Sequence, residues 1–219
     1  MGAKMNLTLY IDSHWISPYA FSAYVALKEK DLAFEIRELA FDKNEQLQGD
    51  YPKMSYTGRI PALVHDDFWL AESSAIAEYL DDRFPMPNYR ALLPSAPEQR
   101  ALARMVMAFV RSDLGALREE RPTTTMFYER AATPLSEKGE RAAQRLVRFA
   151  ERLIRPDQTH MVGEWSIADV DLAFMLQRLH LNGYELPSSL ASFVETQWGR
   201  PSVRSFVEHN RRPFIPYSY

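Results

Sequence analysis

Residues 7–27 read LTLYIDSHWISPYAFSAYVAL, and they predict the first two elements of the fold. Residues 7–11 are apolar or β-favouring and end at Asp12 and Ser13, which predicts a strand. Ser17 and Pro18 then open a helix, because Ser is a preferred N-cap and Pro costs no hydrogen bond at the first helical position. Apolar residues at helical spacing continue that helix: Ala20, Ala23, Tyr24 and Leu27. The chain therefore starts with a strand, a short loop and a helix.

The next sixty residues add further short elements. Residues 33–39 predict a second strand, and the polar residues 43–50 are only weakly helical. Two more strands, 61–65 and 68–70, flank Asp66 and Asp67, which favours a tight hairpin. Ser73 or Ser74 is expected to cap a helix that follows. The order is β-α-β, an irregular helix, then β-β-α, which predicts a small α/β unit with a mixed four-stranded sheet.

Closely spaced prolines separate this part from the rest of the chain, at positions 85, 87, 94 and 97. We therefore expect a first domain over residues 1–84, a linker over 85–97 and a second domain over 98–219. The second domain is expected to be all-α, with long helical patterns at about 98–120, 136–154 and 166–182. Shorter patterns lie near 188–197 and 202–210. Ser166 and Asp169 form a capping-box pattern.

Composition excludes several classes of function. The chain has 219 residues, 46% of them hydrophobic, a net charge of −3 and no cysteine. Disulfides, thiolate metal sites and a cysteine nucleophile are therefore excluded, and the charge gives no support to nucleic-acid binding. The five histidines are scattered, so we expect no metal site. No apolar run is long enough for a membrane helix and no signal peptide is visible, which favours a cytoplasmic protein.

Ser17 has two possible roles, an ordinary helix N-cap or a residue of a functional site. Ordinary N-caps are common, and nothing more is needed to explain a serine before a proline at a helix start. Yet Ser17-Pro18-Tyr19 follows the first strand as the Cys-Pro-Tyr of thioredoxin-like redox folds does, with serine in the place of cysteine. Ile60-Pro61 opens the third strand, where those folds use a cis proline. Glu72 and Ser73 open a helix just after the hairpin.

With these motifs in view, the chain resembles the soluble glutathione S-transferases, of the bacterial serine type that is similar to the zeta and theta classes. The matching motifs are SPYAFSAYVALKEKDL (17–32), GRIPALVHDD (58–67), ESSAIAEYLDDRFP (72–85) and GEWSIADVDLA (163–173). Each motif is loose by itself, but four in this order are specific. The resemblance implies a thioredoxin-like N-terminal domain, a linker and an all-helical C-terminal domain.

The resemblance also implies a site for glutathione, bound as a co-substrate without a metal. Ser17 takes the place of the catalytic serine. Ile60 would pair its backbone with the cysteinyl part of glutathione, Glu72 and Ser73 would bind the γ-glutamyl end, and Gln46 falls where a side chain meets the tripeptide.

Other candidates are weaker. The resemblance implies that Trp15, Ile16 and Arg111 line the electrophile pocket, although a solvated helix face also explains the arginine. Tyr10 and Ser13 are alternative donors to the glutathione sulfur, and Tyr10 also fits a core position. The zeta class reads Ser-Ser-Cys at the turn where this chain has Ser17-Pro18-Tyr19, with an arginine soon after. That departure argues against zeta-type isomerase or dehalogenase activity.

The expected function is glutathione transfer to electrophiles, or glutathione-dependent reduction of peroxides or disulfides, in detoxification and oxidative stress. The alternative is a non-catalytic binding or regulatory protein that has kept the fold. Thiol–disulfide exchange by the protein's own residues is excluded, because it has no cysteine. Homodimerisation is implied by the resemblance alone.

Overall fold

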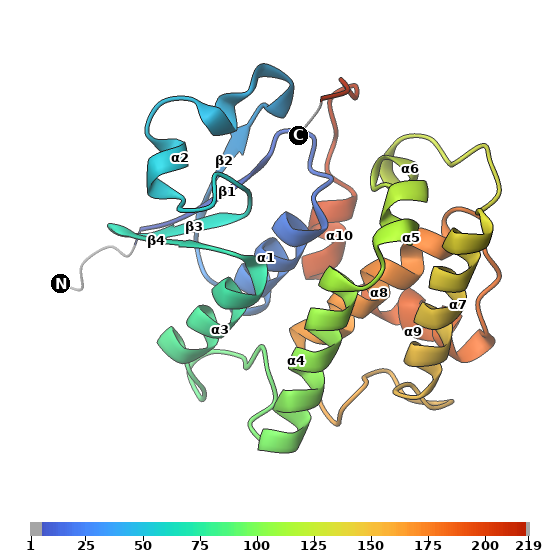
Figure 1. Cartoon of the computed structure of the whole chain (residues 1–219). Helices are drawn as coiled ribbons and strands as arrows, with labels where there is room; N and C mark the ends of the chain where they lie inside the picture. Colours follow the sequence, from blue (N-terminus) through green and yellow to red (C-terminus); the bar gives the residue numbers. More distant parts are fainter. Residues whose placement is uncertain (1–5, 218–219) are drawn as a thin grey trace. The chain divides into compact units, whose positions relative to one another are not determined.

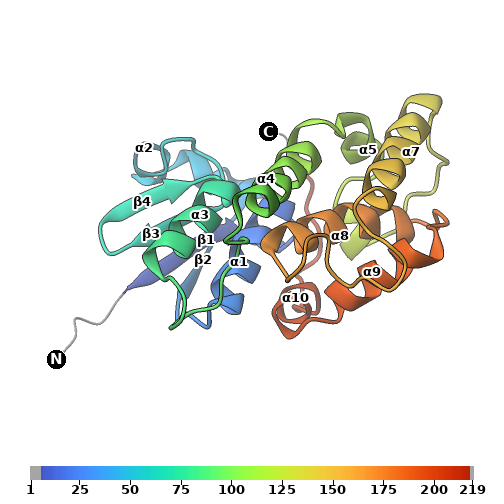
Figure 2. The ribbon, with the colours of Figure 1, turned by 90° about the horizontal axis from the view of Figure 1, so that it is seen from below.

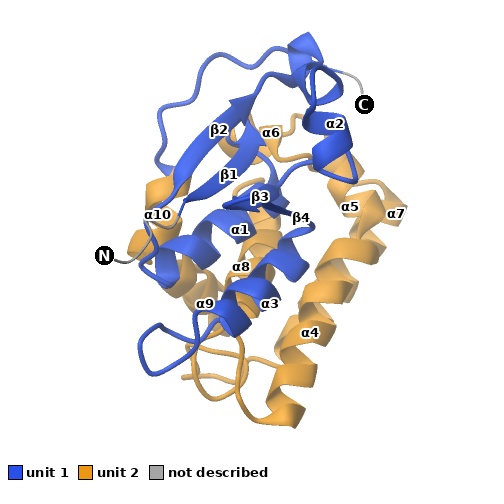
Figure 3. Cartoon of the chain, turned by 90° about the vertical axis from the view of Figure 1, so that its left-hand side faces the viewer, with its two compact units in different colours: residues 1–92, 208–219 blue, residues 93–207 orange. Residues whose placement is uncertain are grey.

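A computed structural model of the chain describes residues 6–217. Within that range the chain forms two compact units: unit 1 comprises residues 6–92 and 208–217, and unit 2 comprises 93–207 (Figure 3). The sequence-based division places the last residues with the helical part. In the structure they belong to unit 1, because Arg211 and Arg212 bond to the loop that follows the first strand.

Unit 1 is built on a four-stranded mixed sheet with the order β2-β1-β3-β4 (Figure 1). The strands are β1 (Leu7–Asp12), β2 (Glu35–Leu39), β3 (Ala62–His65) and β4 (Phe68–Ala71). β1 is parallel to β2 and antiparallel to β3, and β3 is antiparallel to β4. The left-handed Asp66 (φ 54°) lies in the tight turn between β3 and β4. The predicted mixed sheet is confirmed.

Two helices of unit 1 pack together on one face of the sheet, and short helical turns lie on the other (Figure 1). The packed pair is α1 (Pro18–Glu29) and α3 (Ser73–Arg83). The short turns are η1 (Phe41–Lys43), η2 (Glu45–Leu47) and α2 (Tyr51–Met54). α1 is almost wholly buried after its first two residues, as its apolar composition requires. This packing fixes the start of α1 against the end of β1.

Unit 2 is all-helical, as expected, and α8 (Ile167–His180) lies at its centre (Figure 2). α8 packs against α4 (Pro97–Ser112), α7 (Glu137–Glu151) and α9 (Ser188–Trp198). Shorter helices complete the unit: α5 (Gly115–Glu120), α6 (Thr124–Phe127) and α10 (Pro201–Val207). The predicted capping box at the start of α8 is confirmed, because the Asp169 carboxylate accepts the Ser166 N–H at 2.7 Å. Every residue of α8 except the last, His180, is buried, which explains why this helix is only weakly amphipathic.

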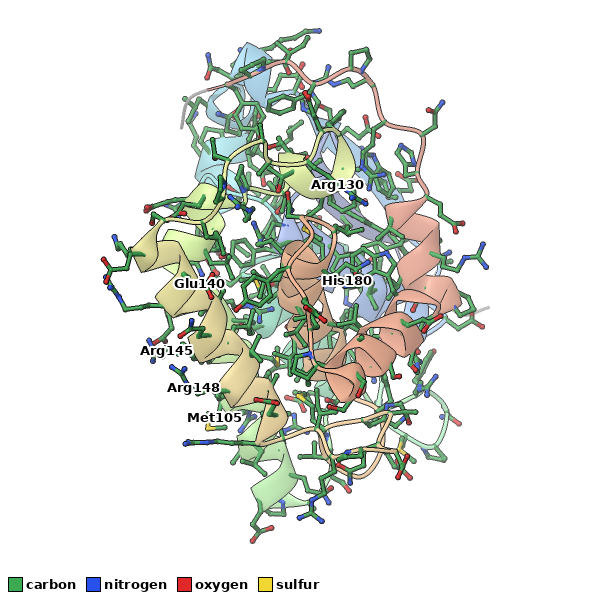
Figure 4. The ribbon with its side chains drawn as sticks, turned by 90° about the vertical axis from the view of Figure 1, so that its right-hand side faces the viewer. Met105, Arg130, Glu140, Arg145, Arg148 and His180 are labelled. Carbon is green, nitrogen blue, oxygen red and sulfur yellow. The ribbon has the colours of Figure 1, made fainter. Side chains whose placement is uncertain are left out.

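One long helix of the expected set is divided. Residues 98–120 carry a continuous helical pattern, but the structure ends α4 at Ser112 and starts α5 at Gly115. An ion pair lies beside this break, between Arg145 on α7 and Asp113 at 2.7 Å. The Arg145 guanidinium also lies over the Phe109 ring, and Phe109 stacks on Phe149 with ring centres 4.1 Å apart. Arg145 and Arg148 project from α7 at the surface of unit 2 (Figure 4).

Candidate functional site

The strand register brings four loops to one end of the unit 1 sheet. Asp12 pairs with Leu39 at the last position of both β1 and β2. Ala62, the first residue of β3, pairs with Tyr10 on one side and with Ala71, the last residue of β4, on the other. The segments that follow β1, β2 and β4 and the segment that precedes β3 therefore share an edge. These are the segments that carry Ser17, Gln46, Glu72 with Ser73, and Ile60.

Ser17 is the N-cap of α1, as predicted. Its backbone is extended (φ −67°, ψ 123°), and its Oγ accepts the Ala20 N–H at 3.2 Å. A hydroxyl has one donor and two acceptor positions, so this cap leaves the O–H to donate. Within residues 6–217 that O–H has no acceptor. Ser17 is half-buried at the start of a twelve-residue helix, where the helix dipole favours an anion.

Asp12 holds the turn before Ser17, a structural role that the sequence analysis missed. Its Oδ2 accepts the Ile16 N–H at 2.9 Å and its Oδ1 accepts the Ser17 N–H at 3.1 Å. The residue is 1% exposed, and burial raises the pKa of its carboxyl although the two backbone bonds favour the charged form. Asp12 therefore fixes the turn that carries Ser17. The sequence signal that could have indicated this role is an acidic residue directly after the apolar residues 7–11.

Ile60 precedes a cis peptide bond to Pro61. Neither its backbone N–H nor its carbonyl has a hydrogen-bond partner among the residues that the structure describes. The loop before it is fixed by the buried Tyr51, whose hydroxyl donates to the Arg59 carbonyl at 2.7 Å. Burial raises the pKa of Tyr51. The Ile60 backbone is thus available to pair with a peptide-like ligand.

Glu72 and Ser73 mark the start of α3. The prediction that Ser73 or Ser74 caps this helix is wrong, because the helix begins at Ser73 and Glu72 is its N-cap. Glu72 has a left-handed backbone (φ 70°), an exposed side chain and no cap bond from that side chain. Ser73 is buried. The first N–H groups of an eleven-residue helix form a site for an anion beside an exposed carboxylate.

Gln46 lies in η2, in the segment that follows β2. The residue is 9% exposed, and its Oε1 has no hydrogen-bond partner within residues 6–217. A buried amide oxygen without a donor costs free energy, so such groups usually have a role. In the described part of the chain, Gln46 Oε1 and His14 Nδ1 are both buried atoms without a hydrogen-bond partner in the segments at this edge.

The predicted pocket residues belong to different units. Trp15 and Ile16 are buried in unit 1, within the turn that leads to Ser17. Arg111 belongs to unit 2, where its guanidinium donates to Asp171 at 2.8 Å and to the Met107 carbonyl at 2.9 Å. Its ion pair with Asp171 already supplies a partner for its charge.

The alternative donors also have partners. The Tyr10 hydroxyl accepts a bond from Arg37 at 3.2 Å, and its ring packs against Tyr51 and Trp69. Ser13 accepts a short bond from Arg212. Among residues 6–217 there is no group of three or more His, Cys, Asp or Glu that could hold a metal ion. Within the same range, each helix is too short or too polar to cross a membrane.

Comparison with known proteins shows the family of this chain. Residues 5–82 match the model of the glutathione S-transferase N-terminal domain, and residues 96–211 match that of the glutathione S-transferase C-terminal domain. Together these matches cover most of the chain. The protein belongs to the glutathione S-transferase family.

Individual relatives extend the match. Glutathione S-transferase Z2 of Arabidopsis thaliana is 30% identical over 97% of this chain and 95% of its own length. A crystal structure of a glutathione transferase homologue from Burkholderia with bound glutathione is 41% identical, with a TM-score of 0.76 over 93% of this chain and 96% of the other. A probable maleylacetoacetate isomerase of Vibrio cholerae is 30% identical over half of each chain.

Proposed function

We propose that this protein is a glutathione transferase that binds glutathione at the shared edge of the unit 1 sheet and activates its thiol with Ser17. The main observation behind the proposal is the strand register, which places the segments with Ser17, Gln46, Ile60 and Glu72 at one end of the sheet. The buried, partnerless Oε1 of Gln46 supports it, as does the glutathione bound to the Burkholderia homologue.

Each end of glutathione has a complementary group in this arrangement. The γ-glutamyl carboxylate would bind the first N–H groups of α3 and the Ser73 hydroxyl, and its ammonium would bind the exposed Glu72 carboxylate. The cysteinyl amide would bond to the open backbone of Ile60. The Gln46 Oε1 would accept an N–H of the tripeptide.

The required change in thiol pKa is within reach of Ser17 and its helix. A free thiol has a pKa of about 8.5 and is only a few per cent ionised near neutral pH. Lowering that pKa by two units takes about 2.7 kcal/mol. A hydrogen bond to a charged group contributes about 1.5–3 kcal/mol, and a helix N-terminus about 0.3–1 kcal/mol. The Ser17 hydroxyl and the dipole of α1 together reach this range without a general base.

In conjugation, the thiol proton leaves to solvent, the sulfur forms a bond to the electrophilic carbon, and the leaving group departs with its electron pair. In peroxide reduction the thiolate instead attacks an oxygen of the peroxide, the O–O bond breaks, and the alkoxide leaves and is protonated to the alcohol. A second glutathione thiol then attacks the sulfenic acid sulfur and displaces its hydroxyl as water, which gives the disulfide. The similarity to a probable maleylacetoacetate isomerase makes glutathione-dependent isomerisation a second candidate, against which stands Ser17-Pro18-Tyr19 in the place of the zeta-class Ser-Ser-Cys. Trp15, Ile16 and Arg111 remain predicted contributors to the second substrate's site.

Calorimetry with glutathione and two variants test the proposal. We expect millimolar or tighter binding by the wild type, and a thiolate absorbance that titrates below the pKa of free glutathione. Ser17→Ala should raise that pKa by one unit or more with little change in affinity. Ser17→Asp keeps a helix-capping oxygen but cannot donate, so it should preserve stability and still lose activation.

Three outcomes would contradict the proposal or part of it. No binding of glutathione would favour the non-catalytic alternative. An unchanged thiol pKa in both Ser17 variants would remove Ser17 from the mechanism. A panel of aryl halides, hydroperoxides, mixed disulfides and cis-alkene acids would separate the candidate reactions, because each class yields a different product.

The resemblance also implies a homodimer in the cytoplasm, and both remain predictions. Unit 1 exposes large apolar side chains that a partner subunit could cover, including Tyr56, which is 81% exposed, and Phe68. Sedimentation should give twice the 25.3 kDa mass of the chain. A species of 25.3 kDa at micromolar concentration would contradict the dimer.

A further inference from the structure

The C-terminal segment, residues 208–217, packs on unit 1 beside the turn that carries Ser17. Figure 3 shows it in the colour of unit 1, beyond the end of α10. It has no helix or strand of its own, so side-chain contacts fix its position. The family model of the C-terminal domain matches residues up to 211, so residues 212–217 lie outside both matched regions.

The first contacts of this segment are to Trp15, which has a left-handed backbone (φ 55°). That conformation is unfavourable for a bulky side chain and persists only where the surroundings support it. The Arg211 guanidinium donates twice to the Trp15 carbonyl, from Nε at 3.2 Å and from Nη2 at 3.1 Å. The His209 ring stacks on the Trp15 indole with centres 3.8 Å apart. Trp15 is therefore supported through both its backbone and its ring.

Trp15 lies two residues before Ser17, in the turn that Asp12 fixes from the inside. The Trp15 N–H donates to the Asp12 carbonyl at 3.0 Å, and the Asp12 carboxylate accepts the next two N–H groups. Arg211 bonds to the same turn from outside. The turn is thus fixed by Asp12 on one side and by Arg211 on the other.

The rest of the segment adds contacts to neighbouring residues. Arg212 pairs with Asp42 at 2.6 Å and bonds to Ser13. The Ile215 N–H donates to His14 Nε2 at 3.3 Å, and the His14 ring packs against Phe214 and Tyr217. Residues 13–15 therefore each contact the C-terminal segment.

We propose that the C-terminal segment fixes the turn from Asp12 to Ser17 in the conformation that activates glutathione, with Arg211 as the positioning residue. The proposal rests on the proposed function, because it assigns the thiol-activating role to Ser17. It predicts that loss of the Arg211 contacts changes the orientation of the Ser17 hydroxyl and leaves the Ile60, Glu72 and Ser73 contacts in place.

The first test needs no glutathione. Hydrogen exchange of the Ile16 and Ser17 amides reports on the turn directly, since both donate to Asp12. Arg211→Ala should speed their exchange by about ten- to a hundredfold, because it removes two bonds from a charged donor. Arg211→Lys, which keeps one charged donor, should give an intermediate rate. Arg141→Ala on α7 is the matched control, since Arg141 is exposed and its ion-pair partner in the described part of the chain is Glu137 on the same helix.

The second test measures the bound thiol. Arg211→Ala should raise the pKa of glutathione bound to the full chain and lower kcat by about tenfold, with its dissociation constant changed less than twofold. Arg211→Lys should recover part of the loss. A purely structural role would instead weaken binding and turnover together.

Unchanged exchange of the two amides in folded Arg211→Ala would overturn the proposal, and so would unchanged exchange in Arg211→Lys if the alanine variant fails to fold. Faster exchange with an unchanged thiol pKa would overturn the activating role of the segment. Failure of Ser17→Ala to alter the thiol pKa would reject the proposed function itself, independently of the exchange result.

Discussion

Asp12 and Ser17 are joined directly: the carboxylate at the end of β1 accepts the backbone N–H of the residue that caps α1, at 3.1 Å. The same carboxylate accepts the Ile16 N–H. A buried side chain therefore sets the position of an otherwise irregular turn. Ser17 is placed by the last residue of the strand before it, and the helix that it caps follows from that position.

Asp12→Asn tests this relationship. The amide has one oxygen and one NH₂ group, so it can accept from only one of the two backbone donors. We expect the free energy of unfolding to fall by about 1.5–3 kcal/mol near neutral pH. Denaturant titration measures it. An unchanged midpoint would show that the two bonds contribute nothing to stability.

The same variant has a pH signature. Burial raises the folded-state pKa of Asp12 above its ordinary value of 3.8. Its titration therefore contributes stability that is present below pH 3.8 and lost as the pH rises through the folded pKa. The stability advantage of wild type over Asp12→Asn should therefore be largest below pH 3.8 and should shrink, as the pH rises through the folded pKa, to the value predicted near neutral pH. A difference independent of pH would contradict the raised pKa.

Gln46→Leu should separate stability from binding. The variant removes a buried amide oxygen that has no donor in the structure, so the free energy of unfolding should stay equal or rise by about 1 kcal/mol. Glutathione affinity should fall about tenfold if that oxygen meets the tripeptide. Calorimetry and denaturant titration on the same preparation measure both. Unchanged affinity would remove Gln46 from the site.

Docking of the C-terminal segment should weaken in acid. Burial lowers the pKa of His14 and the nearby Arg212 lowers it further, while Asp12 and Asp42 oppose them. The docked form needs the neutral ring, because Nε2 accepts the Ile215 N–H. Undocked His14 takes up its proton near its ordinary pKa of 6.5, so docking is complete above that pH and is lost as the pH falls below it.

Hydrogen exchange of the Phe214, Ile215 and Tyr217 amides at about pH 5 and pH 7.5, corrected for intrinsic rates, measures this change. His14→Gln keeps an acceptor that does not titrate and should remove that dependence. Ile215→Pro lacks the N–H and should loosen the segment at both pH values, whereas Ile215→Ala, which keeps the N–H, should not. Equal exchange in the proline and alanine variants would contradict a role for this bond.

Lys30 and Asp81 form the buried ion pair of unit 1, at 2.8 Å, with the Lys30 side chain fully buried. Lys30 Nζ also donates to the Phe84 carbonyl at 2.7 Å. Lys30→Met leaves Asp81 buried without its cation and should cost about 3–5 kcal/mol of unfolding free energy. Arg90→Ala breaks the more exposed pair with Glu29 and should cost about 0–1 kcal/mol. Equal losses in the two variants would contradict the difference in burial.

Local patterns predicted most of the fold. Alternating and continuous apolar runs placed the four strands, and helical spacing placed α1, α3, α7 and α8 close to their observed ends. Ser17 at a helix start followed from capping chemistry and is confirmed. The break at Asp113 and Leu114 was not predicted, because the helical pattern continues through it. The role of Glu72 as N-cap was missed as well, since it depends on a left-handed backbone.

The elements, the mixed sheet and the candidates Ser17, Gln46, Ile60, Glu72 and Ser73 could be predicted from the sequence, because each depends on neighbours in the chain or on a motif. The contact of Asp12 with Ser17, and that of Arg211 with Trp15 from 196 residues away, became visible in the folded chain. Such contacts depend on strand register and side-chain packing between distant segments. The spacing of residues along the chain therefore does not predict them.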